Sequence, residues 1–152
     1  MAGEESNEEF RLFTLAEAEK TRLEVEPVLI EAIETRRKMA GSAEKLHNLA
    51  ERILRNGGIL VPYDQAARWR SELDSYSQNL RGALERIQST GCVVKDLDSG
   101  LLDFPARLND EAIYYCWRLG EDRIRFYHRQ DEGFAGRKPI DPRDQGYRAP
   151  TQ

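Results

Sequence analysis

The sequence has no long hydrophobic run. No apolar stretch among its 152 residues approaches the roughly 20 residues that a membrane-spanning helix needs. Its start, MAGEESNEE, is acidic and polar, unlike the basic and then apolar order of a secretory signal. We therefore expect a cytoplasmic protein that does not enter a membrane.

Cysteine is scarce as well, with two residues in the chain. Two cysteines do not make a disulfide framework, and a reducing compartment disfavours a bond between them. We interpret Cys92 and Cys116 as small core or edge residues.

The chain also lacks an excess of positive charge. Lys and Arg together number 23 against 27 Asp and Glu, which gives a net charge of -4. This balance argues against a general binder of nucleic acids or anionic membranes. The length and the hydrophobic content of 39% are those of one ordinary domain with a buried core.

What the sequence does contain first is a helical pattern. Thr14 followed by Glu17 indicates a capping box at a helix start. Apolar residues then recur every seven positions, and others fill most of the interleaved positions: Ala18, Val25, Ala32, Met39, Leu46 and Ile53, with Leu29, Ala43 and Ala50 between them. Arg22 and Arg36 interrupt the second series. Pro27 predicts a kink or an irregular turn, and a break at Gly41 is left open.

A second helical pattern follows the turn residues Asn56 to Gly58. Its apolar residues alternate spacings of three and four: Ala66, Trp69, Leu73, Tyr76, Leu80, Ala83 and Ile87. Two such seams joined by a tight turn predict an antiparallel, coiled-coil-like helical hairpin over residues 13–91, with Trp69 and Tyr76 in its core. Because the first helix is longer, an overhanging apolar seam favours a homodimer.

From residue 92 the period changes to two, which is typical of strands. Three hairpin-sized gaps separate CVVKDL, LLDFPARL, EAIYYCWRL and RIRFYHR. We predict an α+β fold in which the hairpin is joined to a small four-stranded antiparallel β-meander, with a C-terminal loop, over 92–140. Residues 13–140 then form a single domain, 1–12 a disordered acidic N-terminus and 141–152 a flexible tail.

Four segments carry a resemblance to a known family: FTLAEAEKTRLEVEPVL, KDLDSGLLDFPA, CWRLGEDRI and HRQDEGFAGRKPI. In order and spacing they resemble the bacterial family catalogued as domain of unknown function 2203, from Phe13 to Ile140. The resemblance implies a small soluble bacterial protein and supplies no established activity. In that family an acidic residue often follows the histidine, where this chain has Arg129.

His128 is the main candidate for a site. Its strand places it on one face with Phe126 and Ile124, so we expect its ring to lie among apolar neighbours. One interpretation is a packed histidine hydrogen-bonded to a carbonyl or carboxylate. The other is a divalent metal site in which His128 is joined by Asp131 and Glu132.

The loop after this strand is a candidate anion site, since its glycines offer backbone donors and Arg137 a cation. We predict a ligand region formed by six residues: Trp117, Arg118, Glu121, His128, Asp131 and Arg137.

Three catalytic or binding templates fit poorly. The loop after His128 is too short for a P-loop, and the turn with Asp96, Asp98 and Asp103 lacks the final glutamate of a calcium loop. Cys116 and His128 lie on strands that a hairpin would place side by side, but Cys116 stands among packing residues, so a structural role is favoured over nucleophilic catalysis.

We favour a binding module without chemistry of its own, for a small anionic ligand, a metal ion or a protein partner. The alternatives are a metal-assisted hydrolase that uses His128, Asp131 and Glu132, and a scaffold or adaptor that acts through its helices.

Overall fold

The structure is a computed structural model that describes residues 11–58 and 62–141. The predicted acidic N-terminus and C-terminal tail fall almost entirely outside the described residues. By its internal contacts the chain forms two compact units, one from Pro27 to Arg86 and one that joins the chain up to Glu26 with the chain from Ile87 onward. The prediction of a single domain over 13–140 stays a prediction.

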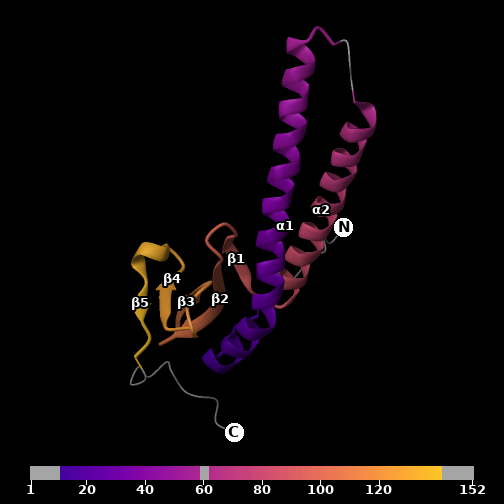
Figure 1. Cartoon of the computed structure of the whole chain (residues 1–152). Coiled ribbons are helices and arrows are strands. Elements are labelled where there is room, and N and C mark those ends of the chain that lie inside the picture. The colour runs from indigo at the N-terminus through magenta and orange to yellow at the C-terminus, as the bar shows by residue number, and fades with distance from the viewer. Residues whose placement is uncertain (1–10, 59–61, 142–152) are drawn as a thin grey trace, which may run out of the picture. The chain divides into compact units, whose positions relative to one another are not determined.

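Two long helices form the predicted hairpin, α1 (Leu15–Arg55) and α2 (Tyr63–Ser89), which lie side by side in Figure 1. The Thr14 cap is confirmed, because the Glu17 backbone N–H donates to Thr14 Oγ1 at 3.1 Å. The Glu17 carboxylate accepts the Thr14 hydroxyl at 3.0 Å. Helix α1 continues without interruption through Pro27 and Gly41, so the break that the sequence left open does not occur.

The buried row of the hairpin differs in part from the predicted one. Leu29 and Ala32 are fully buried, as predicted, but Ser42 and Leu49 are buried while Ala43 and Ala50 are exposed. Beyond Ala32 the interleaved buried residues therefore lie three positions after the residues of the seven-residue series, whereas the sequence predicted four positions. Trp69 and Tyr76 are half-buried rather than enclosed in the core.

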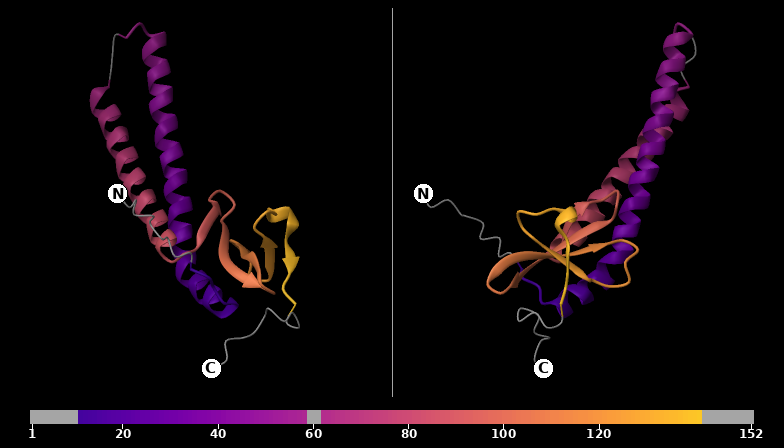
Figure 2. Two further views of the ribbon diagram at one scale, coloured as in Figure 1. Left: turned by 180° about the vertical axis from the view of Figure 1, so that it is seen from behind. Right: turned by 90° about the vertical axis from the view of Figure 1, so that its left-hand side faces the viewer.

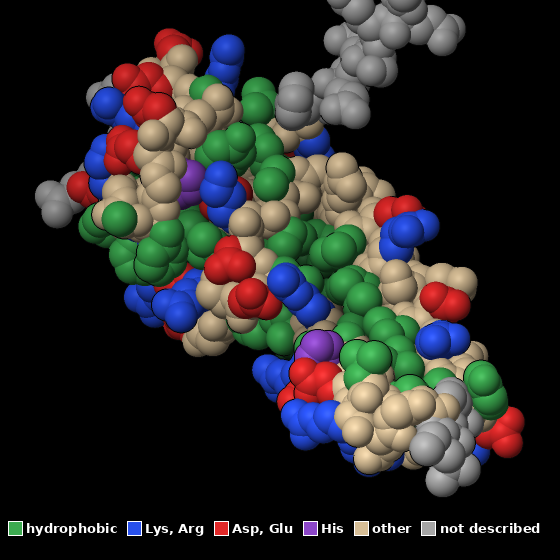
Figure 3. All heavy atoms as spheres, turned by 90° about the horizontal axis from the view of Figure 1, so that it is seen from above, with side chains coloured by type: hydrophobic (Ala, Val, Ile, Leu, Met, Phe, Trp, Pro, Cys, Tyr) green, Lys and Arg blue, Asp and Glu red, His purple; other side chains and the backbone are tan. Residues whose placement is uncertain are grey.

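Between the helices, within the unit from Pro27 to Arg86, the polar contacts include an ion pair and a cation–π contact. Arg86 pairs with Glu31 at 3.1 Å, and the Lys45 ammonium lies 6.0 Å from the centre of the Trp69 ring. Figure 3 shows apolar side chains interspersed with charged ones of both signs on one face of the molecule. In the part of the chain that the structure describes, no helix combines the length and the apolar character that a bilayer-spanning segment requires.

The sheet is an antiparallel meander of five strands in the order β1-β2-β3-β4-β5 (Figure 2). Its strands are β1 (Val93–Asp96), β2 (Leu101–Leu108), β3 (Glu111–Arg118), β4 (Phe126–Arg129) and β5 (Lys138–Pro139). The α+β prediction is confirmed, and the meander gains a fifth strand within the predicted C-terminal loop. A 3-10 turn, η1 (Phe134–Gly136), precedes that strand. The two residues of β5 have too little sequence to show a period.

One face of the sheet packs on the start of α1, inside the same compact unit. Phe13 meets Phe104 edge-on with ring centres 5.3 Å apart, and the Phe13 N–H donates to the Pro105 carbonyl. The buried guanidinium of Arg22 lies 5.5 Å from the Trp117 ring, and it also binds Glu19 and the backbone carbonyl of Asp122. Arg22, which interrupts the apolar series, is thus buried through ion pairing.

The other face of the sheet is covered too. Residues 101 to 106 of β2 are all buried, a pattern expected only when both faces of a strand are shielded from water. Arg137, at the end of η1, stacks on Phe126 of β4 at 4.1 Å from its ring centre. Side chains on this second face are therefore enclosed even where they are polar.

Candidate functional site

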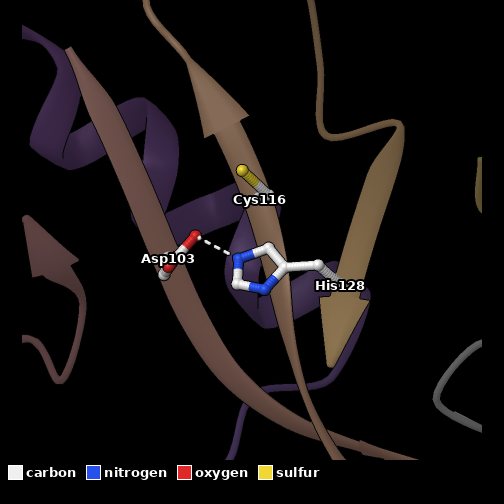
Figure 4. A group of neighbouring side chains, drawn as sticks. All are labelled: Asp103, Cys116 and His128. Atoms are coloured by element: carbon white, nitrogen blue, oxygen red, sulfur yellow. Dashed lines mark hydrogen bonds and ion pairs between the residues drawn. The ribbon is translucent and has the colours of Figure 1, made fainter. Parts of the chain in front are cut away.

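Three polar side chains meet on the second face of the sheet, one from each of the strands β2, β3 and β4. They are Asp103, Cys116 and His128, which we call the buried cluster. The strand register places Asp103 directly opposite Cys116, and His128 opposite Tyr114. Figure 4 shows the imidazole reaching across β3 toward the carboxylate, with the thiol on the same side.

The cluster is closed to solvent and tight. Asp103 is 2% exposed, His128 3% and Cys116 0%. One possible ligand atom from each residue lies within 4.8 Å of the others. A carboxylate, a thiol and an imidazole in an apolar interior are costly to bury unless they are hydrogen-bonded or hold an ion.

Both ring nitrogens of His128 have partners. Nδ1 lies 2.8 Å from the carbonyl oxygen of Arg129, and Nε2 lies 3.1 Å from Asp103 Oδ1. A carbonyl oxygen only accepts, so Nδ1 carries the proton of that bond. The contact between Nε2 and Asp103 then holds one further proton, and the pair is neutral as a whole. These contacts match the first of the two interpretations, a packed histidine bonded to a carbonyl or carboxylate, but the ring lies against Asp103 and Cys116 and not among the apolar neighbours that were expected.

The thiol of Cys116 is not an activated nucleophile. Burial, followed by the negative charge of Asp103, raises the pKa of Cys116 to about 12, although Arg137 acts in the opposite direction. The thiolate that nucleophilic catalysis needs is therefore disfavoured at neutral pH. The raised pKa argues against nucleophilic catalysis by Cys116, and the purely structural role stays a prediction.

Cys92 allows a prediction about pH. Burial raises the pKa of the Cys92 thiol above its ordinary value of 9.0. Above that pH the unfolded chain loses the proton and the folded chain keeps it, so stability must fall as pH rises. We expect the stability advantage of the metal-free native chain over Cys92→Ala to shrink by about 1 kcal/mol per pH unit between roughly pH 9 and 10.5. Urea unfolding at several pH values measures it, and a constant difference would contradict the prediction.

Three of the six predicted ligand residues, Trp117, Arg118 and Arg137, contact a fourth, Glu121. Both oxygens of its carboxylate accept hydrogen bonds from Arg137 Nη2, at 2.7 and 2.8 Å. Its Oε1 also accepts the backbone N–H of Arg118 at 2.6 Å. Its carbonyl accepts Trp117 Nε1 at 3.1 Å. Among the described side chains, Arg137 Nε is the buried polar atom without a hydrogen-bond partner.

The remaining predicted residues are dispersed. His128 belongs to the buried cluster, Asp131 is exposed, and Glu132 pairs with Lys138 at 3.2 Å. Neither Asp131 nor Glu132 belongs to the cluster, and Asp103 takes the place that the sequence interpretation gave them. The sequence did contain an indication of Asp103. A two-residue hairpin turn at Asn109-Asp110 fixes the register of the two strands, and that register places residue 103 opposite residue 116.

Comparison with protein families finds a match. The family model described as "Uncharacterized conserved protein (DUF2203)" matches residues 11–140. The chain belongs to this family. No curated protein and no solved structure matches the chain. All three cluster residues of this DUF2203 chain lie inside the matched range, so the cluster is built within the family's domain and not in an added segment.

Proposed function

We propose that this DUF2203 protein is a metal-binding module whose buried cluster of Asp103, Cys116 and His128 takes a divalent ion of the zinc class. The observation that carries the proposal is the orientation of the imidazole. Nδ1 donates to a backbone carbonyl, which leaves Nε2 facing a carboxylate and a thiol. Metal-bound histidines are commonly held in this way by a second hydrogen bond.

The chemistry of the three groups selects the ion. A thiol ligand disfavours magnesium and calcium, which prefer oxygen, whereas zinc accepts sulfur, nitrogen and oxygen together. Zinc–ligand bonds are about 2.0–2.3 Å long, so the direct bond between His128 and Asp103 must open to admit the ion. Three protein ligands leave a fourth position for water or another small ligand.

The charges balance with and without the ion. Without a metal ion, the cluster would hold one proton between Asp103 and His128 and one on the Cys116 thiol, which leaves it neutral. An ion of charge +2 replaces these two protons and meets a carboxylate, a thiolate and a neutral imidazole. The loaded cluster is therefore neutral as well, which is the condition for burying it without an uncompensated charge.

Other functions remain proposals of lower support. A hydrolase with Asp131 and Glu132 as ligands would need these side chains beside His128, while the structure gives them other positions. The homodimer and the scaffold role stay predictions, with Ile30, Leu54 and Tyr63 as exposed apolar residues of the hairpin. The two free buried cysteines support placing the protein in a reducing compartment such as the cytoplasm.

The test is metal analysis of the full chain, purified without chelator and loaded with zinc. We expect about one zinc per chain, and an affinity at least ~100-fold weaker for Cys116→Ser and His128→Gln, because each removes a ligand. Competition with a chromophoric chelator measures the affinity, and circular dichroism checks that each variant folds.

Two matched controls sharpen the result. Cys92→Ser changes the other buried cysteine, which lies outside the cluster, and should keep the zinc. The double variant Asp131→Asn with Glu132→Gln removes the two carboxylates that the sequence favoured and should also keep it. The proposal would be contradicted if the native chain and folded Cys116→Ser bound zinc equally well. It would also be contradicted if the native chain bound no zinc.

A further inference from the structure

A second feature of the sheet is a pocket beside the turn between β1 and β2. It has a volume of about 230 Å³ and is lined by Asp96, Ser99, Leu101, Arg118 and Phe134. Pockets for drug-sized ligands usually measure about 300–1,000 Å³, so this one suits a smaller molecule. None of its lining residues belongs to the buried cluster.

Arg118 supplies an unpaired positive charge. Its side chain is exposed, and within the described ranges its guanidinium has no hydrogen-bond or ion-pair partner. The guanidinium lies 5.8 Å from the centre of the Phe134 ring. Glu121, the acid next to it, is already bound to Arg137 through both oxygens. Arg118 is therefore available to bind a carboxylate through two parallel hydrogen bonds.

Asp96 supplies the opposite charge in the lining of the same pocket. Its Oδ1 accepts the backbone N–H of Asp98 at 3.2 Å, and its Oδ2 accepts the Ser99 hydroxyl at 2.7 Å. These bonds fix the orientation of the carboxylate. No cation is bonded to it among the residues that the structure describes, and each oxygen can accept a further hydrogen bond.

Gly100 allows the turn beside the pocket to pack closely against the end of β3. Its φ is +69°, and a Cβ added there would lie 2.6 Å from Cβ of Leu119. The Leu119 N–H donates to the Gly100 carbonyl at 2.9 Å. This close approach keeps the turn, with Asp96 and Ser99, against the end of β3 that carries Arg118.

Apolar surface completes the lining. Leu101 is buried beneath the pocket, and Phe134 is 41% exposed, unusual for a large aromatic side chain. The Phe134 ring is supported by the Arg137 guanidinium at 4.5 Å from its centre. A ligand group that packs on Phe134 and Leu101 would remove this apolar surface from water.

We infer that this pocket binds a small zwitterion of the α-amino-acid class, with its carboxylate on Arg118, its ammonium on Asp96 and an apolar side chain against Phe134. One charge of each sign and one apolar surface match the three parts of such a molecule. The inference goes beyond metal binding and uses none of the three cluster residues, so either proposal can fail alone.

The experiment titrates L-leucine and L-phenylalanine into the full chain, with binding measured by calorimetry and by NMR. We expect one of them to bind with a dissociation constant of about 1 mM or tighter. L-Leucinamide and L-phenylalaninamide lack the carboxylate, and the N-acetyl amino acids lack the ammonium. Each is expected to bind at least about tenfold more weakly.

Variants locate the site. Arg118→Gln and Asp96→Asn are expected to weaken binding at least about tenfold, whereas Arg123→Gln, an exposed arginine of the same unit, should leave it unchanged. Titrations run with zinc and with chelator keep this outcome separate from that of the metal proposal. Absence of binding by both amino acids at about 10 mM, equal binding of the amide or acetyl forms, or full binding by Arg118→Gln would each overturn the inference.

Discussion

Replacing His128 by alanine is expected to lower the free energy of unfolding of the metal-free protein by about 3–5 kcal/mol. The change removes the imidazole that lies 3.1 Å from Asp103 and leaves that carboxylate, 2% exposed, without its ring partner. A buried charge whose partner is deleted cannot recover its hydration, so the loss exceeds the strength of the bond itself. Packing against Tyr114, whose ring centre lies 5.4 Å away, is lost too.

The measurement is urea unfolding in the presence of a chelator, in a Trp69→Phe background where Trp117 alone reports on the sheet. The other histidine is the matched control. His47 is 72% exposed and pairs with Glu51 within one helix turn, so His47→Ala should change stability by less than about 0.5 kcal/mol.

A double variant separates the two contributions. Asp103→Leu combined with His128→Leu removes both polar partners and should recover much of the loss, because neither a lone carboxylate nor a lone imidazole remains buried. If His128→Ala proved within about 1 kcal/mol of the native chain, the bond between His128 and Asp103 would not hold the cluster together as described.

Replacing Trp117 by alanine is expected to destabilise the sheet by about 3–5 kcal/mol. Trp117 is fully buried, packs under the Arg22 guanidinium and donates its indole N–H to the Glu121 carbonyl. The substitution leaves a large cavity between β3 and the start of α1, and it removes a hydrogen bond worth about 1 kcal/mol. Urea unfolding followed by circular dichroism measures the loss.

Trp69→Ala is the control for this experiment, because Trp69 is only half-buried on the helical hairpin. Its loss should be less than half of that for Trp117→Ala, since less apolar surface returns to water. Equal effects of the two substitutions would contradict the assignment of Trp117 to the core. A Trp117→Ala protein that gives no folded signal at all would place the loss at or above the upper end of the range.

The two helices of the hairpin and the change to strands were predictable because both produce a short, regular spacing of apolar residues along the chain. The cap at Thr14 and the strand pattern after Gly91 depend on neighbours within a few residues. The buried row at Ser42 and Leu49 was missed because Ser42 is polar, and a pattern search by hydrophobicity passes over it. The alternative residues Ala43 and Ala50 are small and apolar but face solvent.

One part of the candidate site was also predictable from the sequence, and the other part was not. The pairing of Asp103 with Cys116 follows from a two-residue turn whose members Asn109 and Asp110 both have positive φ, 49° and 62°. The seven-residue connection between β3 and β4 fixes no register, so nothing in the sequence placed His128 beside Asp103. Asp131 and Glu132 were nearer to His128 along the chain, which made them the natural candidates.

The sequence by itself determined the order of the elements and the pairing of Asp103 with Cys116, because these follow from local periods and from a two-residue turn. Only the tertiary structure decided that the second face of the sheet is covered. The short segment with Phe134 and Arg137 folds back over it, and so a carboxylate and an imidazole that an open sheet would leave in water become each other's partners. Burial depends on contacts between distant parts of the chain, and no local pattern records them.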